Sequence, residues 1–173
     1  MFCEENSCLI IETLFDDPDE EHYIRGLAEE TGLAPSTVSR RLEELKKDGI
    51  VEIDEEGVRN RVKARKNNRK FKALKRSHNL YRVSESGLVE ELMDNLFPEA
   101  VILFGSYRRG EDRKNSDIDI AVVNGREETI EKEKFEERFN REINIHNVNL
   151  EKAGDNFIET LANGITLRGH LEI

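Results

Sequence analysis

The sequence predicts a two-domain protein of mixed structure, α+β in its first part and α/β in its second. Helical patterns followed by two short strand patterns occupy residues 1–65, and strand patterns that alternate with helical patterns occupy residues 85–173. Residues 66–84 lie between them and are expected to form a basic linker helix. A chain of 173 residues has the length of one large or two small domains, and the change of pattern favours two.

Charge is distributed unevenly along the chain. The net charge is −10, yet residues 57–84 carry 11 basic and no acidic side chains. Residues 1–56 and 85–173 carry net charges of −12 and −9, so the basic segment is a cationic region within an acidic protein. Such a region favours an anionic partner, or an acidic face of the same protein.

The composition favours a cytoplasmic protein without a membrane partner. Apolar residues make up 36% of the chain and charged residues 37%, so much of the surface must be charged. No stretch approaches the roughly 20 apolar residues of a membrane span. The first residues also lack the basic and then apolar pattern of a signal peptide.

The first domain is expected to contain three helices and a β-hairpin. Apolar residues at helical spacing predict the helices, which span residues 6–16, 20–31 and 34–48. Gly32 suits the end of the second helix, because glycine readily adopts the left-handed conformation found there. Residues 50–53 and 58–62 are expected to pair as the hairpin, around a turn at 55–57.

Residues 27–42 read L-A-E-E-T-G-L-A-P-S-T-V-S-R-R-L and resemble a helix-turn-helix. With the hairpin behind it, the segment 1–65 is similar to a winged-helix domain. The second helix begins with a small, polar and cationic face, which can enter a major groove and contact phosphates. The resemblance implies DNA binding, and a three-helix module that contacts another protein is the alternative. The expected DNA-binding residues are Ser36, Thr37, Ser39, Arg40, Arg41, Arg59 and Arg61.

Two helices are expected after the hairpin. Residues 65–79 are rich in lysine and arginine, and residues 81–97 carry leucines along one stripe, with Pro98 after their end. The basic helix has three interpretations: a contact with the DNA backbone, a surface that receives an RNA substrate, or a solvated helix face.

The second domain is expected to alternate strands with helices around a mixed sheet. Apolar runs predict strands over residues 101–104, 118–123, 143–148 and 165–167. Helical spacing predicts helices over residues 127–140 and 152–162. The order strand, strand, helix, strand, helix, strand is typical of an α/β arrangement.

The strongest chemical signal is a pair of aspartates in an apolar strand pattern. Asp117 and Asp119 alternate with Ile118 and Ile120, although aspartate is depleted in strands. A period of two residues places both carboxylates on one face of the strand. Because neighbouring carboxylates repel unless a cation lies between them, the pair predicts a metal site.

Two short motifs surround the loop before these aspartates. The chain reads G-S-Y-R-R-G from Gly105 to Gly110 and S-D-I-D from Ser116 to Asp119, which together follow the pattern G-S-x10-D-x-D. This combination resembles the polymerase-beta-like nucleotidyltransferase superfamily, and most closely its minimal nucleotidyltransferases, over roughly residues 86–170. The resemblance implies a nucleotidyltransferase fold and Mg²⁺-dependent transfer of a nucleoside monophosphate, AMP from ATP, to a hydroxyl.

The resemblance also implies roles for individual residues. Backbone N–H groups at the Gly-Ser turn can cradle a triphosphate, and paired aspartates can hold one or two Mg²⁺ ions. The expected nucleotide-binding residues are Gly105, Ser106, Arg109 and Ser116. The expected catalytic and metal-binding residues are Asp117, Asp119 and Glu142.

The chain departs from the family pattern at two positions. A later strand of the family usually carries a third carboxylate, and here Glu142, Asn144 and His146 share one face of the candidate strand. Glu142 is the expected general base and second-metal ligand. If Asn144 is the true equivalent, the site lacks one charge. Arg108 stands where the family usually has a small residue, and either adds a phosphate contact or points to solvent.

Two functions fit these observations. The first is an enzyme that modifies a protein or RNA acceptor, and the resemblance suggests a HEPN-type toxin as one such protein. The second is a transcription regulator whose nucleotidyltransferase-like domain binds nucleotide without turnover. A homodimer is compatible with either function. A pure interaction scaffold would leave the paired aspartates unexplained.

Overall fold

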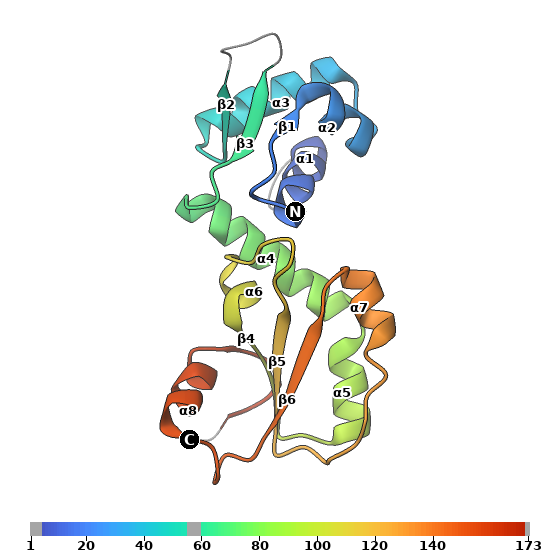
Figure 1. Cartoon of the computed structure of the whole chain (residues 1–173), viewed down its shortest axis with the longest axis vertical. Coiled ribbons are helices and arrows are strands. Elements are labelled where there is room, and N and C mark those ends of the chain that lie inside the picture. The colour runs from blue at the N-terminus through green and yellow to red at the C-terminus, as the bar shows by residue number, and fades with distance from the viewer. Residues whose placement is uncertain (1–4, 55–59, 172–173) are drawn as a thin grey trace. The chain divides into compact units, whose positions relative to one another are not determined.

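The computed structural model describes residues 5–54 and 60–171, and the chain divides into two compact units, Met1–Lys75 and Arg76–Ile173. Both units combine helices with a β-sheet, which confirms the expected fold class (Figure 1). Among the residues described, no helix has the length and apolar character that a bilayer crossing requires.

The first unit contains three helices and a small antiparallel sheet. The helices are α1 (Glu5–Asp16), α2 (Ile24–Thr31) and α3 (Pro35–Lys47). The strands β1 (His22–Tyr23), β2 (Val51–Asp54) and β3 (Arg61–Ala64) form a sheet in the order β1-β3-β2. Gly32 ends α2 with a φ of 69°, as expected, and so allows the tight turn into α3. The expected turn at residues 55–57 lies outside the described residues.

The helix expected over residues 20–31 begins later, at Ile24. His22 and Tyr23 instead pair with Val62 and Arg61 of β3 and form the third strand of the sheet. Tyr23 is 40% exposed, although it is one of the apolar residues on which the helical pattern rested. Its position in the helical pattern was therefore misleading, because pairing with a distant strand decided the local structure.

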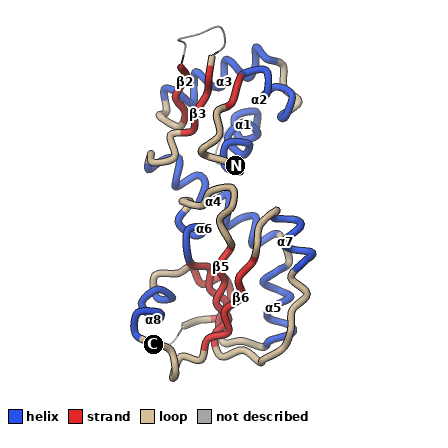
Figure 2. Tube along the Cα trace, in the orientation of Figure 1, coloured by secondary structure: helices blue, strands red, loops and turns tan. Residues whose placement is uncertain are grey.

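The basic segment forms one helix, α4 (Arg69–Glu85), followed by α5 (Leu88–Leu96). The expected break near residue 80 is wrong, since the helices separate at Gly87, which has a φ of 82° (Figure 2). The Oγ of Ser86 accepts a hydrogen bond from the backbone N–H of Leu88 at 3.1 Å, in the turn that joins the two helices.

The boundary between the two units lies within α4, between Lys75 and Arg76, and not at residue 65 as expected. Phe71 is fully buried in the core of the first unit, and Lys75 is buried with its Nζ donating to the backbone oxygen of Phe15 at 2.7 Å. Further along the same helix, Val83 is fully buried in the core of the second unit. The segment expected to be a linker thus supplies interior residues to both units.

The second unit is built on a four-stranded mixed sheet in the order β6-β5-β4-β7. The strands are β4 (Ala100–Phe104), β5 (Ile118–Val123), β6 (Ile143–Val148) and β7 (Ile165–Gly169). The helices that follow α5 are α6 (Gly105–Arg109), α7 (Glu133–Phe139) and α8 (Asp155–Ala162). Both α7 and α8 are shorter than expected, and α6 replaces the start of a predicted loop. The strands β5 and β6 are parallel, and the other pairs are antiparallel.

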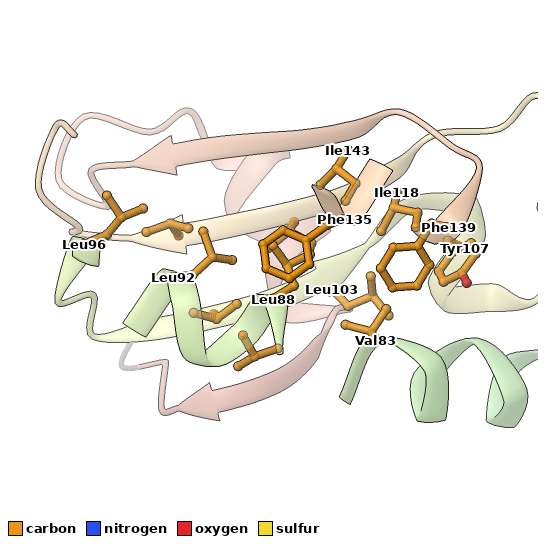
Figure 3. Packing of buried hydrophobic residues seen from close by; sticks show 14 residues of the cluster. Val83, Leu88, Leu92, Leu96, Leu103, Tyr107, Ile118, Phe135, Phe139 and Ile143 are labelled. Atoms are coloured by element: carbon orange, nitrogen blue, oxygen red, sulfur yellow. The ribbon is translucent and has the colours of Figure 1, made fainter. Parts of the chain in front are cut away.

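The two faces of this sheet have separate cores. On one face, Leu103, Ile118 and Ile143 pack with residues of α5 and α7, as Figure 3 shows. On the other face, Phe104 and Ala121 pack with residues of α8. Because side chains alternate along a strand, Asp119 has the same parity as Ala121 and projects on the α8 side of the sheet.

Candidate functional site

The two aspartates lie where β5 begins and β4 ends. Asp117 immediately precedes β5, and Asp119 is the second residue of this strand. Asp119 is paired with Phe104, the last residue of β4, on one side and with Asn144 of β6 on the other. Both carboxylates are half-buried. The end of β4 and the starts of β5 and β6 therefore meet at one edge of the sheet, beside the two aspartates.

Gly105 lies against the Asp119 carboxylate. It follows β4 with a φ of +72°, and a Cβ added to it would lie 2.2 Å from Asp119 Oδ2. Glycine is needed here for two reasons, because both the left-handed backbone and the close approach exclude a side chain. The structure thus brings together the glycine and the aspartate of the two sequence motifs. Ser106 follows in the first turn of α6 and is half-buried.

The side chain of Asn144 contacts both aspartates. Its Nδ2 donates to Asp117 Oδ2 at 3.1 Å and to Asp119 Oδ1 at 3.4 Å. One neutral amide therefore contacts both carboxylates and offsets part of their repulsion. Asn144 is the residue that the sequence offered as the alternative to Glu142 at the position of the third carboxylate.

Glu142, the expected third carboxylate, is not brought to the aspartates. It is exposed and precedes β6, and its backbone oxygen accepts a hydrogen bond from Ile118 N at 2.9 Å. Within the described residues, no group of three His, Cys, Asp or Glu side chains is arranged to hold a metal ion. The register of β5 and β6 sets Asn144 beside Asp119.

His146 shares the face of Asn144, as strand parity predicted. Its Nε2 lies 3.9 Å from Asp119 Oδ1. The imidazole ring lies 5.4 Å from the Phe104 ring and 6.1 Å from the Phe157 ring, measured between centroids. Aromatic rings from β4, β6 and α8 therefore lie together on the face of the sheet from which Asp119 projects.

Two protein-family models match the chain, one in each unit. Residues 87–169 match the family model for polymerase beta, nucleotidyltransferase, and residues 9–52 match the model for winged helix-turn-helix DNA-binding. The chain joins a winged helix-turn-helix domain to a nucleotidyltransferase domain of the polymerase-beta family. Comparisons with curated proteins and with solved structures gave no match.

Cationic side chains gather at α6 of the nucleotidyltransferase domain. Burial, followed by the nearby charges of Arg76 and Arg109, lowers the pKa of the half-buried Arg108. The Nε of Arg109 donates to Glu111 Oε2 at 2.9 Å, so this expected phosphate ligand is paired on the surface. The departure at Arg108 therefore adds a cation to a positive cluster next to the Gly-Ser turn.

Ser116, another expected phosphate ligand, stabilises the loop before Asp117. Its Oγ accepts a hydrogen bond from the backbone N–H of Arg113 at 2.9 Å. Two other residues act on this loop and were not predicted from the sequence, Arg141 and Asp112, which form a buried ion pair. A single charged residue before a strand carries no periodic signal, and only the pairing of β5 with β6 brings these two residues together.

The start of β6 is held by α7. Glu136 Oε1 accepts a hydrogen bond from Ile143 N at 2.8 Å, and Lys132 Nζ donates to Ile143 O at 2.8 Å. The hydrogen bond from Ile143, followed by that from Lys132, lowers the pKa of Glu136 below its ordinary value of 4.5. Glu136 therefore remains an ionised acceptor at neutral pH, where the strand that carries Asn144 begins to pair with β5.

In the winged helix-turn-helix domain, α3 presents the expected polar face to solvent. Arg41 lies at the side of this face, where its Nη1 donates to Glu44 Oε2 at 2.7 Å and its side chain is 14% exposed. Arg41 is thus already engaged within the helix. The other expected residues of α3 are Ser36, Ser39 and Arg40, which are exposed, and Thr37, which is half-buried.

The expected cation of the hairpin is paired with acidic groups. Arg61 Nη2 donates to Asp54 Oδ2 at 2.7 Å, and its Nη1 lies 3.6 Å from Glu21 Oε2. The hydrogen bond from Lys63, together with the charges of Lys63 and Arg61, lowers the pKa of Glu21, so the carboxylate stays charged. Arg59 lies outside the described residues.

The close approach of Gly105 to Asp119 leads to a prediction about metal binding. Gly105→Ala should weaken the binding of Mn²⁺ with ATP by about tenfold or more, because the new Cβ must displace the Asp119 carboxylate. Gly87→Ala is the matched control, since Gly87 has a φ of +82° and a Cβ added there would meet open space within 4 Å. Each left-handed alanine should cost about 1–2 kcal/mol of stability.

Isothermal titration calorimetry and thermal unfolding would separate these effects. We expect similar losses of thermal stability in the two variants and a loss of affinity in Gly105→Ala alone. Equal Mn²⁺–ATP affinity in Gly105→Ala and the wild type would contradict the role assigned to this glycine.

Proposed function

We propose that the protein is a Mg²⁺-dependent nucleotidyltransferase that transfers AMP from ATP to a hydroxyl of a protein or RNA acceptor, and that its winged helix binds DNA. The observation that carries this proposal is the convergence of Asp117 and Asp119 on one amide nitrogen, beside the glycine turn at the end of β4. The match of residues 87–169 to the nucleotidyltransferase family supports the same class of reaction.

The donor set fits magnesium. Carboxylate oxygens are preferred protein ligands of Mg²⁺, which keeps several waters and binds through one or two carboxylates together with substrate phosphates. Asp117 and Asp119 would hold the ion, and the backbone of Gly105 and Ser106 would approach the triphosphate. The bound ion supplies positive charge that stabilises the phosphate oxygens during displacement.

The transfer itself is an in-line displacement. The acceptor oxygen forms a bond to the α-phosphorus, and the bond from that phosphorus to the oxygen bridging to the β-phosphate breaks. Pyrophosphate leaves, and the proton of the hydroxyl is released. Arg108 and Arg109 lie on α6, directly after the glycine turn, where their positive charge favours the triphosphate and the leaving pyrophosphate.

The acceptor is a protein or an RNA in this proposal. The family resemblance favours a HEPN-type toxin as a protein acceptor. The positive cluster of Arg76, Arg108 and Arg109 would also suit the phosphates of an RNA. A second copy of this chain bound as a homodimer is compatible with either acceptor.

The proposed transfer is tested with ATP labelled at the α-phosphate, Mg²⁺ and cell extract. We expect label to appear on a protein or RNA with the wild type, and to be absent with Asp117→Asn/Asp119→Asn, which lacks both charges that would hold the metal. ATP labelled at the γ-phosphate should leave the acceptor unlabelled. Equal α-label with the wild type and the double variant would overturn the proposal.

A second candidate function is a DNA-binding regulator that binds nucleotide without turnover. Asn144 favours it, because an amide contacts both aspartates where the family usually has a carboxylate. An amide adds no negative charge to the site and accepts no proton at neutral pH. Nucleotide binding would remain under this function, whereas activation of the acceptor hydroxyl would be lost.

Asn144→Asp distinguishes the two candidates. If the regulator is correct, this variant should gain AMP transfer of about tenfold or more over the wild type, since it supplies the missing carboxylate. Asn147→Asp is the matched control, because it adds the same charge to β6 at a residue that bonds to Gly125 O and Arg126 O.

The measurement is the rate of label transfer, accompanied by thermal unfolding with and without Mg²⁺. In Asn144→Asp, the third carboxylate should lower the melting temperature in the absence of Mg²⁺, and added Mg²⁺ should restore it. An active wild type whose rate falls in Asn144→Asp would reject the regulator.

DNA binding is expected to depend on Arg40 more than on Arg61. Arg40→Ala should weaken binding to a duplex from the protein's own promoter region by about tenfold. It should also reduce the slope of log affinity against log salt concentration by about one. Arg61→Ala should have a smaller effect, since this side chain is already paired with Asp54 and Glu21. Fluorescence anisotropy over a series of salt concentrations measures both. A larger loss for Arg61→Ala would contradict this ranking.

A further inference from the structure

A buried ion pair joins the loop before β5 to the loop before β6. Arg141 Nη2 lies 3.2 Å from Asp112 Oδ2, and the two side chains are 5% and 1% exposed. Burying two charges is costly unless further hydrogen bonds satisfy them. The other contacts of Arg141 and Asp112 therefore indicate what this pair holds in place.

Asp112 is held from α4 as well. Asn79 is 3% exposed, and its Nδ2 donates to Asp112 Oδ1 at 2.7 Å and to the backbone oxygen of Tyr107 at 2.9 Å. The guanidinium carbon of Arg141 lies 5.7 Å from the centroid of the Tyr107 ring. Asp112 therefore accepts a hydrogen bond at one oxygen and pairs with Arg141 at the other, inside a small polar cluster.

Arg141 extends this cluster to the backbone beside the aspartates. Its Nη1 donates to the carbonyl oxygens of Arg113, of Lys114 at 3.3 Å and of Ser116 at 2.9 Å. Ser116 immediately precedes Asp117. A single guanidinium thus binds three carbonyls of the loop that leads into the site.

The two aspartates differ in what holds them. Asp119 lies within β5 and is fixed by pairing with Phe104 and Asn144 on both sides. Asp117 lies outside the strand, so its position depends on the loop that Arg141 binds. A displacement of about 1 Å at such a site reduces a rate by about a hundredfold.

We propose that Arg141 is a positioning residue that holds Asp117 in place for metal binding, with Asp112 neutralising its charge. The metal part of this inference rests on the proposed function. The planar guanidinium has five donors in a fixed arrangement, which allows it to bind several carbonyls and a carboxylate at once. A lysine keeps the charge but lacks this arrangement, so Arg141→Lys tests the geometry with little loss of bulk.

The first measurement requires no ligand. Amide hydrogen exchange of the full chain should become about tenfold faster over residues 111–119 in Arg141→Lys, and remain unchanged over residues 100–104 of β4. Asp112→Asn should show the same change to a smaller extent. Arg126→Lys is the matched control, because Arg126 also stacks on an aromatic ring, Phe97, at 4.4 Å.

The second measurement is binding, by titration with Mn²⁺ alone and with ATP alone. Arg141→Lys should weaken Mn²⁺ binding by about tenfold, while metal-free ATP binding and the melting temperature stay close to those of Arg126→Lys. Unchanged exchange over residues 111–119 would overturn the inference. So would faster exchange throughout the second unit, which would indicate a general loss of stability.

The two proposals fail in different ways. If the wild type binds no Mn²⁺, the proposed function is wrong, and hydrogen exchange still decides whether Arg141 holds the loop. If the wild type binds Mn²⁺ and Arg141→Lys binds it equally well, the positioning role is wrong and the proposed function stands.

Discussion

The repulsion between two half-buried carboxylates is the constraint on which the site of the second unit depends. Asp117 and Asp119 share one edge of the sheet, and their repulsion increases where water is partly excluded. Three neighbours act on this pair in different ways. Asn144 donates to both carboxylates, Gly105 leaves the space that Asp119 occupies, and Arg141 binds the loop before Asp117. The surroundings therefore hold the two charges close together without a third acid.

Much of this site could be predicted from the sequence because its signals are local. The strands β5 and β6 have the residue bounds that their apolar runs predicted, and the period of two placed Asp117 and Asp119 correctly relative to Ile118. The Gly-Ser motif located the turn after β4, since few residues other than glycine tolerate a φ of +72°. Turn chemistry and strand parity both operate over a few residues, so a single chain contains them.

The rest depended on contacts between segments that are distant in the sequence. Strand parity permits both Glu142 and Asn144 on one face, and only the register between β5 and β6 decides which lies beside Asp119. The buried pair of Arg141 and Asp112 could not be predicted from the sequence either, because charged residues are usually exposed. The strand β1 was mistaken for helix for the same reason, since its partner is β3.

Asn144 also changes the charge balance of the site. With a carboxylate at this position, three acidic side chains would carry a charge of about −3, which favours two divalent ions together with a triphosphate. With the amide, Asp117 and Asp119 carry about −2, a charge that one divalent ion neutralises. Under either candidate function, such a site would still favour one metal-bound nucleotide, and it would have less need of a second ion. The two candidate functions, nucleotide binding with turnover and nucleotide binding alone, therefore differ in what they require of Asn144, whose amide contacts both aspartates.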